Sequence, residues 1–171
     1  MTAVDVAALV LRLVVGLTMA AHGYNHVFGG GGLAGTTRWF ASMGLRPARV
    51  HAVVSGAGEL ACGLGLVIGL LTPLCAAFVV GTMTVAGVAV HRTNGFFVFK
   101  DGFEYVLVLA VVCVVVGLLG PGVVSVDHLL GIDTDLDGGV GAAIAGGAGL
   151  LGAAVLLAVC WRPERTAEDP T

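Results

Sequence analysis

Charged side chains are scarce in this sequence: they make up 11% of its 171 residues, whereas hydrophobic residues make up 57%. The mean hydropathy is +1.01. A soluble domain of this length has too little interior to bury so much apolar surface, so the composition excludes one and predicts a chain that crosses a membrane several times. The net charge of −3 indicates no nucleic-acid partner.

Motifs for soluble cofactors are also missing. The sequence has no GxGxxG, no P-loop, no nucleophile elbow and no CxxCH, so it offers no motif for NAD, flavin or haem. Its few cysteines all lie in apolar segments and form no CxxC pair, and we interpret them as small buried hydrophobes: Cys62, Cys75, Cys113 and Cys160. Any redox cofactor must therefore be membrane-borne or belong to a partner.

Five apolar stretches approach the length needed to cross about 30 Å of hydrocarbon. They are roughly 3–22, 52–71, 74–90, 103–119 and 140–161. The apolar run from Ala3 has no basic region before it, so we expect it to be retained as a span rather than cleaved as a signal. Only Thr72 and Pro73 separate the second and third stretches, which predicts antiparallel neighbours. The predicted fold class is all-α, a polytopic membrane helix bundle with a four-helix core and a fifth transmembrane helix.

Basic residues gather on one side of this predicted bundle. Of eight Lys and Arg residues, Arg12 lies within a span, and the other seven reach the same side: Arg38, Arg46, Arg49, Arg92, Lys100, Arg162 and Arg165. The opposite side carries Asp127 and the acidic 133–137 loop. The positive-inside rule makes the basic side cytoplasmic, with the N-terminus outside and the C-terminus in the cytoplasm. Segment 23–51 mixes aromatic and basic residues, which predicts a short helix at the cytoplasmic membrane surface.

Arg12 and Glu59 lie deep within apolar stretches, and Glu104 lies one residue inside another. A charge near the bilayer centre costs about 2.5–3.5 kcal/mol on insertion scales, so it is tolerated mainly where it faces protein or a wet cavity. Arg12 precedes His22 by ten residues and Glu59 follows His51 by eight. These similar depths predict an ion pair between Arg12 and Glu59.

The predicted pair has two interpretations. It is either structural, with each charge neutralising the other, or the floor of a pocket with His22 at its mouth. Such a pocket suits a quinone, whose carbonyls need hydrogen-bond donors and whose reduction needs proton carriers. His91 and Glu104 lie at the same boundary, so the candidate cofactor-binding residues are Arg12, His22, Glu59, His91 and Glu104.

Other patterns have simpler explanations. Glu104 fits equally a helix cap in which Asp101 caps the fourth span. The histidines lack an HExxH or Cys/His cluster, so we predict no metal or haem site. Residues 133–137 copy the first half of an EF-hand loop, but Ile144 stands where the bidentate Glu belongs, which leaves calcium binding open. Small residues at helix-packing intervals serve either the bundle itself or a homo-oligomer face.

Several short motifs resemble the DoxX family of small bacterial membrane proteins. They cover about residues 9–132 and comprise Leu11 and Arg12 with Gly16, His22 and Gly23, Gly58 and Glu59 with Gly63, residues 101–104, and 120–122 with Ser125 and Asp127. The resemblance implies a four-helix core and a role as membrane subunit in redox complexes. Some relatives belong to a thiosulfate:quinone oxidoreductase, and actinobacterial ones are linked to oxidative-stress assemblies with a sulfurtransferase and a superoxide dismutase.

We therefore divide the chain into a DoxX-like core, residues 1–132, and a remainder, 133–171, with an acidic outer loop, the fifth span and a charged cytoplasmic tail. The predicted function is a quinone-interacting membrane subunit of a redox or thiol/oxidative-stress complex in the bacterial plasma membrane, not catalytic alone. One alternative is a non-catalytic scaffold that recruits soluble redox enzymes to the cytoplasmic face. A third is a small-molecule transporter that works as an oligomer.

Overall fold

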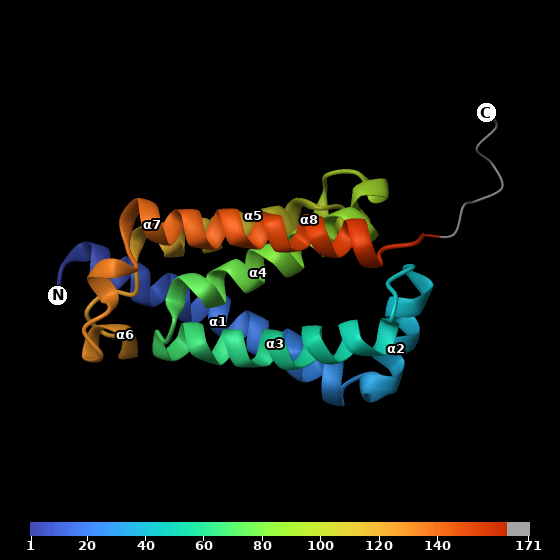
Figure 1. The fold of residues 1–171 in the computed structure, drawn as a ribbon, viewed down its shortest axis with the longest axis horizontal. Coiled ribbons are helices and arrows are strands. Elements are labelled where there is room, and N and C mark those ends of the chain that lie inside the picture. The colour runs from blue at the N-terminus through green and yellow to red at the C-terminus, as the bar shows by residue number, and fades with distance from the viewer. Residues whose placement is uncertain (164–171) are drawn as a thin grey trace.

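The computed structural model describes residues 1–163 (Figure 1). Arg165, one of the predicted cytoplasmic residues, and most of the predicted tail lie outside this range. The helices are α1 (Ala3–Phe28), α2 (Gly32–Ser42), α3 (Ala48–Ile68), α4 (Thr72–Ala86), α5 (Glu104–Leu119), α6 (Val126–Leu129), α7 (Gly138–Ala142) and α8 (Gly149–Cys160). A π-helical turn, Gly87–His91, prolongs α4, and another, Ala143–Ala148, joins α7 to α8.

The predicted all-α fold class is confirmed. Four helical rods are long and apolar enough to span a membrane: Ala3–Phe28, Ala48–Ile68, Thr72–Asn94 and Gly138–Cys160. A fifth rod, α5, is apolar after its first residue, Glu104, but has only 16 residues. No sheet forms within residues 1–163, where the single β-bridge joins Leu45 to Trp161.

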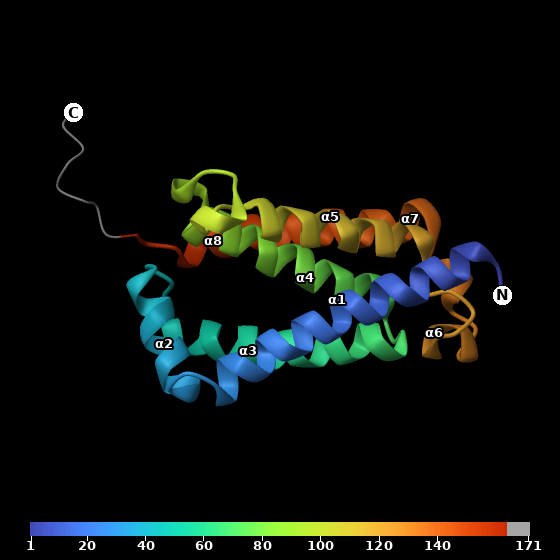
Figure 2. The same cartoon turned by 180° about the vertical axis from the view of Figure 1, so that it is seen from behind.

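The rods form two halves. Helices α1, α2 and α3 pack together in the first half, and α4, α5, α7 and α8 pack together in the second. Glycines let α1 and α3 touch, because a Cβ at Gly23 would meet the backbone of Leu60 and one at Gly16 would meet the carbonyl of Gly63. The halves converge at the end that holds the N-terminus and α6, and they diverge toward α2 (Figures 1 and 2).

Two polar contacts fasten the convergent end. Asp127, fully buried, accepts hydrogen bonds from the backbone N–H groups of Leu71 (2.7 Å) and Thr72 (2.9 Å), where α4 begins. Leu71 has a positive φ of 49°, so the turn between α3 and α4 needs this support. Thr2 and Asp5 form a capping box that starts α1 at the same end.

The divergent end carries the exposed basic residues within the described range: Arg38, Arg46, Arg49, Arg92, Lys100 and Arg162. Helix α2 lies across this end (Figure 1), within the segment expected to hold a surface helix. The boundaries of that segment differ from the prediction, since α1 continues to Phe28 and α3 already begins at Ala48. Which end faces the cytoplasm stays a prediction from the charge bias.

The acidic loop lies at the opposite end. Asp133–Asp135 forms a 3-10 turn, and His128 Nδ1 lies 2.6 Å from Asp133 Oδ2. This hydrogen bond from His128 is the main cause that holds the pKa of Asp133 below its ordinary value. One carboxylate of the half EF-hand pattern is therefore already engaged by a histidine.

Candidate functional site

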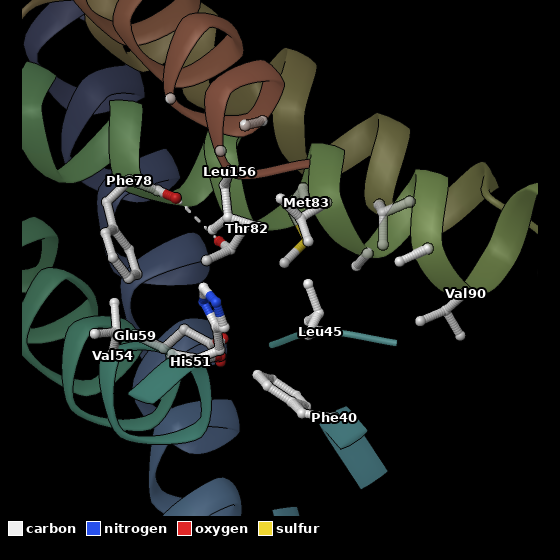
Figure 3. A pocket seen from close by; sticks show the side chains of 18 of the residues that line it. Phe40, Leu45, His51, Val54, Glu59, Phe78, Thr82, Met83, Val90 and Leu156 are labelled. Atoms are coloured by element: carbon white, nitrogen blue, oxygen red, sulfur yellow. Dashed lines mark hydrogen bonds between the residues drawn. The ribbon is translucent and has the colours of Figure 1, made fainter. Parts of the chain in front are cut away.

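A cavity of about 660 Å³ lies between the two halves, toward the divergent end (Figure 3). Helices α1, α2 and α3 form one wall, and α4, α5 and α8 form the other. The walls are largely apolar. The polar side chains that line it are His22, His26, His51, Ser55, Glu59, Thr82, His91 and Tyr105.

Glu59 is the one carboxylic acid among the lining residues, and its side chain is only 5% exposed. Ser55 Oγ donates a hydrogen bond to Glu59 Oε1, and His26 Nε2 lies 3.6 Å from Glu59 Oε2. No Lys or Arg forms a salt bridge with Glu59 anywhere in residues 1–163. The carboxyl group therefore sits in an apolar enclosure with only a hydroxyl and an imidazole as polar partners, an arrangement suited to proton exchange.

Aromatic contacts hold two histidines of α1 in place. The His26 ring stacks on Trp39 with centroids 5.9 Å apart and meets the edge of Phe40 at the same separation. The His22 ring stacks on Tyr105 of α5 at 6.4 Å, which joins the two halves on one side of the cavity. Both rings thus border the cavity from fixed positions.

The divergent end is tied together by the chain after α8. Arg46 N donates to Cys160 O (2.9 Å), Arg162 N donates to Gly44 O (2.8 Å), and Trp161 Nε1 donates to Met43 O (2.9 Å). These contacts join the segment before α3 to the end of α8. The predicted fifth span, which ends in α8, is therefore tied to the first half of the bundle, and α8 also lines the cavity.

Small residues on α8 leave room for the cavity. Three of them line the cavity: Gly149, Gly152 and Ala153. A Cβ at Gly149 would meet the carbonyl of Ala77 at 2.6 Å, so this glycine permits close helix packing. A Cβ at Gly152, in contrast, would meet nothing within 4 Å. Substitution at Gly152 thus adds volume without a backbone clash.

Arg12 lies at the other end of α1 and does not line the cavity. Its side chain is fully buried, and Nη2 donates to Val124 O at 2.6 Å. Its Nε and Nη1 atoms have no hydrogen-bond partner, and no salt bridge joins Arg12 to a carboxylate within residues 1–163. The predicted ion pair between Arg12 and Glu59 is therefore wrong.

The reason is the register of two antiparallel helices. Gly16 of α1 faces Gly63 of α3, and Gly23 faces Leu60. Each step forward along α1 matches a step back along α3, so Arg12 lies beside Gly69, whereas Glu59 lies level with His22 and Gly23. Glu59 and Gly69 lie ten residues apart on α3. At 1.5 Å per residue, Glu59 is therefore about 15 Å from the level of Arg12.

The remaining candidates divide in the same way. His91 lines the cavity, and its Nδ1 lies 2.6 Å from Asp101 O. Glu104 does not line it, and its Oε2 accepts a hydrogen bond from Val98 N at 2.9 Å, which fastens the loop before α5. Asp101 has a positive φ of 56° and does not cap α5, so the predicted cap is wrong in that respect.

The cavity thus brings together His22, Glu59 and His91 and leaves out Arg12 and Glu104. Sequence reasoning missed His26 and Ser55 as neighbours of Glu59. Their spacing held a signal, because His26 lies four residues after His22, and Ser55 lies four before Glu59, each pair on one helical face.

The family model described as DoxX matches residues 7–92 of the chain. The chain belongs to the DoxX family. It is a multi-pass membrane protein, as its apolar rods also indicate. The matched region of this DoxX protein runs from α1 to the end of the α4 rod and includes His22, Glu59 and His91, whereas α5 and α8 lie beyond it. No curated protein and no solved structure matches the chain.

Proposed function

We propose that this DoxX-family protein binds a membrane quinone in the cavity between its halves, as the membrane subunit of a redox or thiol/oxidative-stress complex. The observation that supports the proposal is the composition of the cavity: apolar walls, one buried carboxyl group and a set of histidines in about 660 Å³. Ligand pockets of this size typically combine apolar walls with a few placed polar groups.

A quinone matches these groups chemically. Its ring and tail are apolar and suit walls such as Phe78 and Met83, and its carbonyl oxygens only accept hydrogen bonds. Glu59 in its protonated form and the ring N–H groups of His26 and His22 are suitable donors. Reduction of a quinone consumes protons. Glu59 and the histidines that line the cavity carry these protons to the quinone oxygens.

Equilibrium binding tests this proposal. Purified protein in lipid nanodiscs is titrated with decylubiquinone, and the Kd is compared with that of Glu59→Leu, whose side chain is similar in size but donates no hydrogen bond. We expect at least tenfold weaker binding, about 1.4 kcal/mol. Glu104→Leu is the matched control, because Glu104 lies outside the cavity. Equal loss in both variants, or in neither, contradicts the proposed site.

The scaffold is the second candidate, and the exposed basic residues of the divergent end favour it. Arg46 and Arg49 flank the start of α3 and face away from the protein. A scaffold predicts that Arg46→Glu and Arg49→Glu release soluble redox enzymes from membranes while quinone binding is unchanged. Two results together support the scaffold over the quinone subunit. The wild-type protein binds no quinone, and membranes retain the soluble enzymes only when these arginines are intact.

A further inference from the structure

The cavity reaches the outside of the bundle between α3 and the last rod, Gly138–Cys160. Three of its lining residues on these two rods are both apolar and exposed: Val54, Ala148 and Gly152. Val54 is 51% exposed, and a Cβ at Gly152 would meet nothing within 4 Å. Both α3 and α8 pack on α4, which is visible between them in Figure 1. These three residues therefore form the rim of a lateral opening.

The lateral opening lies at the depth of the membrane interior. The last rod has 23 residues and is long and apolar enough to cross a bilayer. Ala148 is the eleventh of them, so about 15 Å or more of helix lies on each side of it. The hydrocarbon core of a bilayer is about 30 Å thick. The opening consequently faces acyl chains rather than lipid headgroups or water.

The opening is also level with the buried carboxyl group. A Cβ at Gly58 of α3 would meet the Phe78 ring of α4, and a Cβ at Gly149 would meet the backbone carbonyl of the residue before Phe78. Gly58 and Gly149 therefore pack against α4 at nearly the same level. Glu59 follows Gly58, and Ala148 precedes Gly149. A ligand that enters between the two rods meets Glu59 without moving along the bundle.

The other borders of the cavity differ from this one. On the side of α1 and α5, the rings of His22 and Tyr105 stack 6.4 Å apart, so two polar side chains stand at that border. Toward the divergent end, Leu45 lines the cavity, is 3% exposed and bridges to Trp161. Only the lateral opening combines exposure with an entirely apolar rim, which is the border that a hydrocarbon chain crosses at least cost.

We propose that the quinone bound in this cavity enters from the bilayer through the lateral opening and leaves its hydrocarbon tail there, between Val54 and the last rod. This inference rests on the proposed function, which supplies the quinone ring beside Glu59. It narrows the ligand to an amphiphile with a small head that accepts hydrogen bonds and a long apolar tail. The tail stays among acyl chains, so it needs no groove of its own on the protein.

Obstruction of the opening is the first test. Ala148→Trp and Val54→Trp place an indole at the rim, so the tail loses its path, and we expect the Kd of decylubiquinone in nanodiscs to rise at least tenfold. Ala154→Trp and Val53→Trp are the matched controls, because both positions are exposed on the same rods and neither lines the cavity. Their Kd should equal that of the wild type. Monodisperse elution in size-exclusion chromatography shows that each variant keeps its fold.

Photolabelling locates the tail directly. The probe is a decylubiquinone analogue with a diazirine at the end of its tail, irradiated in nanodiscs with the wild-type protein. Labelled peptides are identified by mass spectrometry, with and without an excess of decylubiquinone as competitor. We expect the competed label on α3 and on the last rod.

The outcomes separate this inference from the proposed function. Competed label on α1 and α5, or on α2, moves the tail to another border of the cavity and overturns the lateral opening, while the quinone site stands. Equal affinity in all four tryptophan variants, or equal loss in the controls, also overturns it. Wild-type protein that binds no quinone overturns both.

Discussion

Glu59 of α3 and His26 of α1 face each other with 3.6 Å between Glu59 Oε2 and His26 Nε2. Each is held by further contacts, Glu59 by Ser55 and His26 by the rings of Trp39 and Phe40. The carboxyl group that lines the cavity is therefore paired with a titratable ring rather than with a permanent cation. Such a pair can gain or lose a proton without leaving an unpaired fixed charge in the membrane.

This pairing predicts energetic coupling between Glu59 and His26. Glu59→Gln and His26→Asn should each lower the apparent Tm, and the double variant should lose less than the sum, with a coupling of about 0.5–3 kcal/mol. Arg12 supplies the matched comparison, because Arg12→Gln and Glu59→Gln should be additive at a separation of about 15 Å. Thermal unfolding in detergent measures all combinations. Coupling to Arg12 instead of His26 would contradict the register of α1 and α3.

The convergent end predicts two stabilising buried groups. Arg12 is fully buried and donates to Val124 O, and Asp127 holds two N–H groups at the start of α4. A hydrogen bond to a charged group contributes about 1.5–3 kcal/mol. Arg12→Ala or Asp127→Ala should therefore lower the apparent Tm strongly. Asp135→Ala, in the exposed loop, is the control and should leave Tm unchanged.

Close packing of α1 on α3 predicts a further loss of stability. Gly23→Ala places a Cβ against the backbone of Leu60, which is not able to move aside as a side chain does. Overpacking of this kind costs about 1–3 kcal/mol. Gly147→Ala is the matched control, since nothing lies within 4 Å of a Cβ at that position. Equal yield and equal Tm for the two variants would show that α1 and α3 do not touch at Gly23.

Topology is open to a direct chemical test. In a variant without native cysteines, Lys100→Cys should react with an impermeant maleimide only after permeabilisation of the cells, whereas Thr134→Cys should react in intact cells. The physical reason is the positive-inside bias, since the end with Lys100 carries the exposed basic residues. The reverse labelling pattern would invert the orientation of the whole bundle.

The spans could be predicted because their signals are local. Apolar length identifies each rod, and the link of Thr72 and Pro73 is too short for anything but adjacent antiparallel helices. The family resemblance rested on short motifs over about residues 9–132, and the match to residues 7–92 confirms the family. The motifs at 101–104 and 120–127 lie beyond the matched region. The division at residue 132 stays a prediction, although α8 packs on α4 and lines the same cavity as the core.

The site itself depends on properties that no local pattern contains. The polar residues from His22 to His26 were interpreted as a span boundary, but His22 and His26 line the cavity, and α1 continues through this segment to Phe28. That extension shifts the depth of Arg12 and breaks its predicted pairing with Glu59.

Filling the cavity tests the central claim most directly. Gly152→Leu adds a side chain on the cavity wall without a backbone clash, and Gly147→Leu adds the same side chain at an open position on the same rod that does not line the cavity. The decylubiquinone Kd of each variant in nanodiscs is compared with that of the wild type. We expect Gly152→Leu to weaken binding at least tenfold and Gly147→Leu to leave it unchanged. Wild-type affinity in Gly152→Leu would place the quinone outside this cavity and contradict the account.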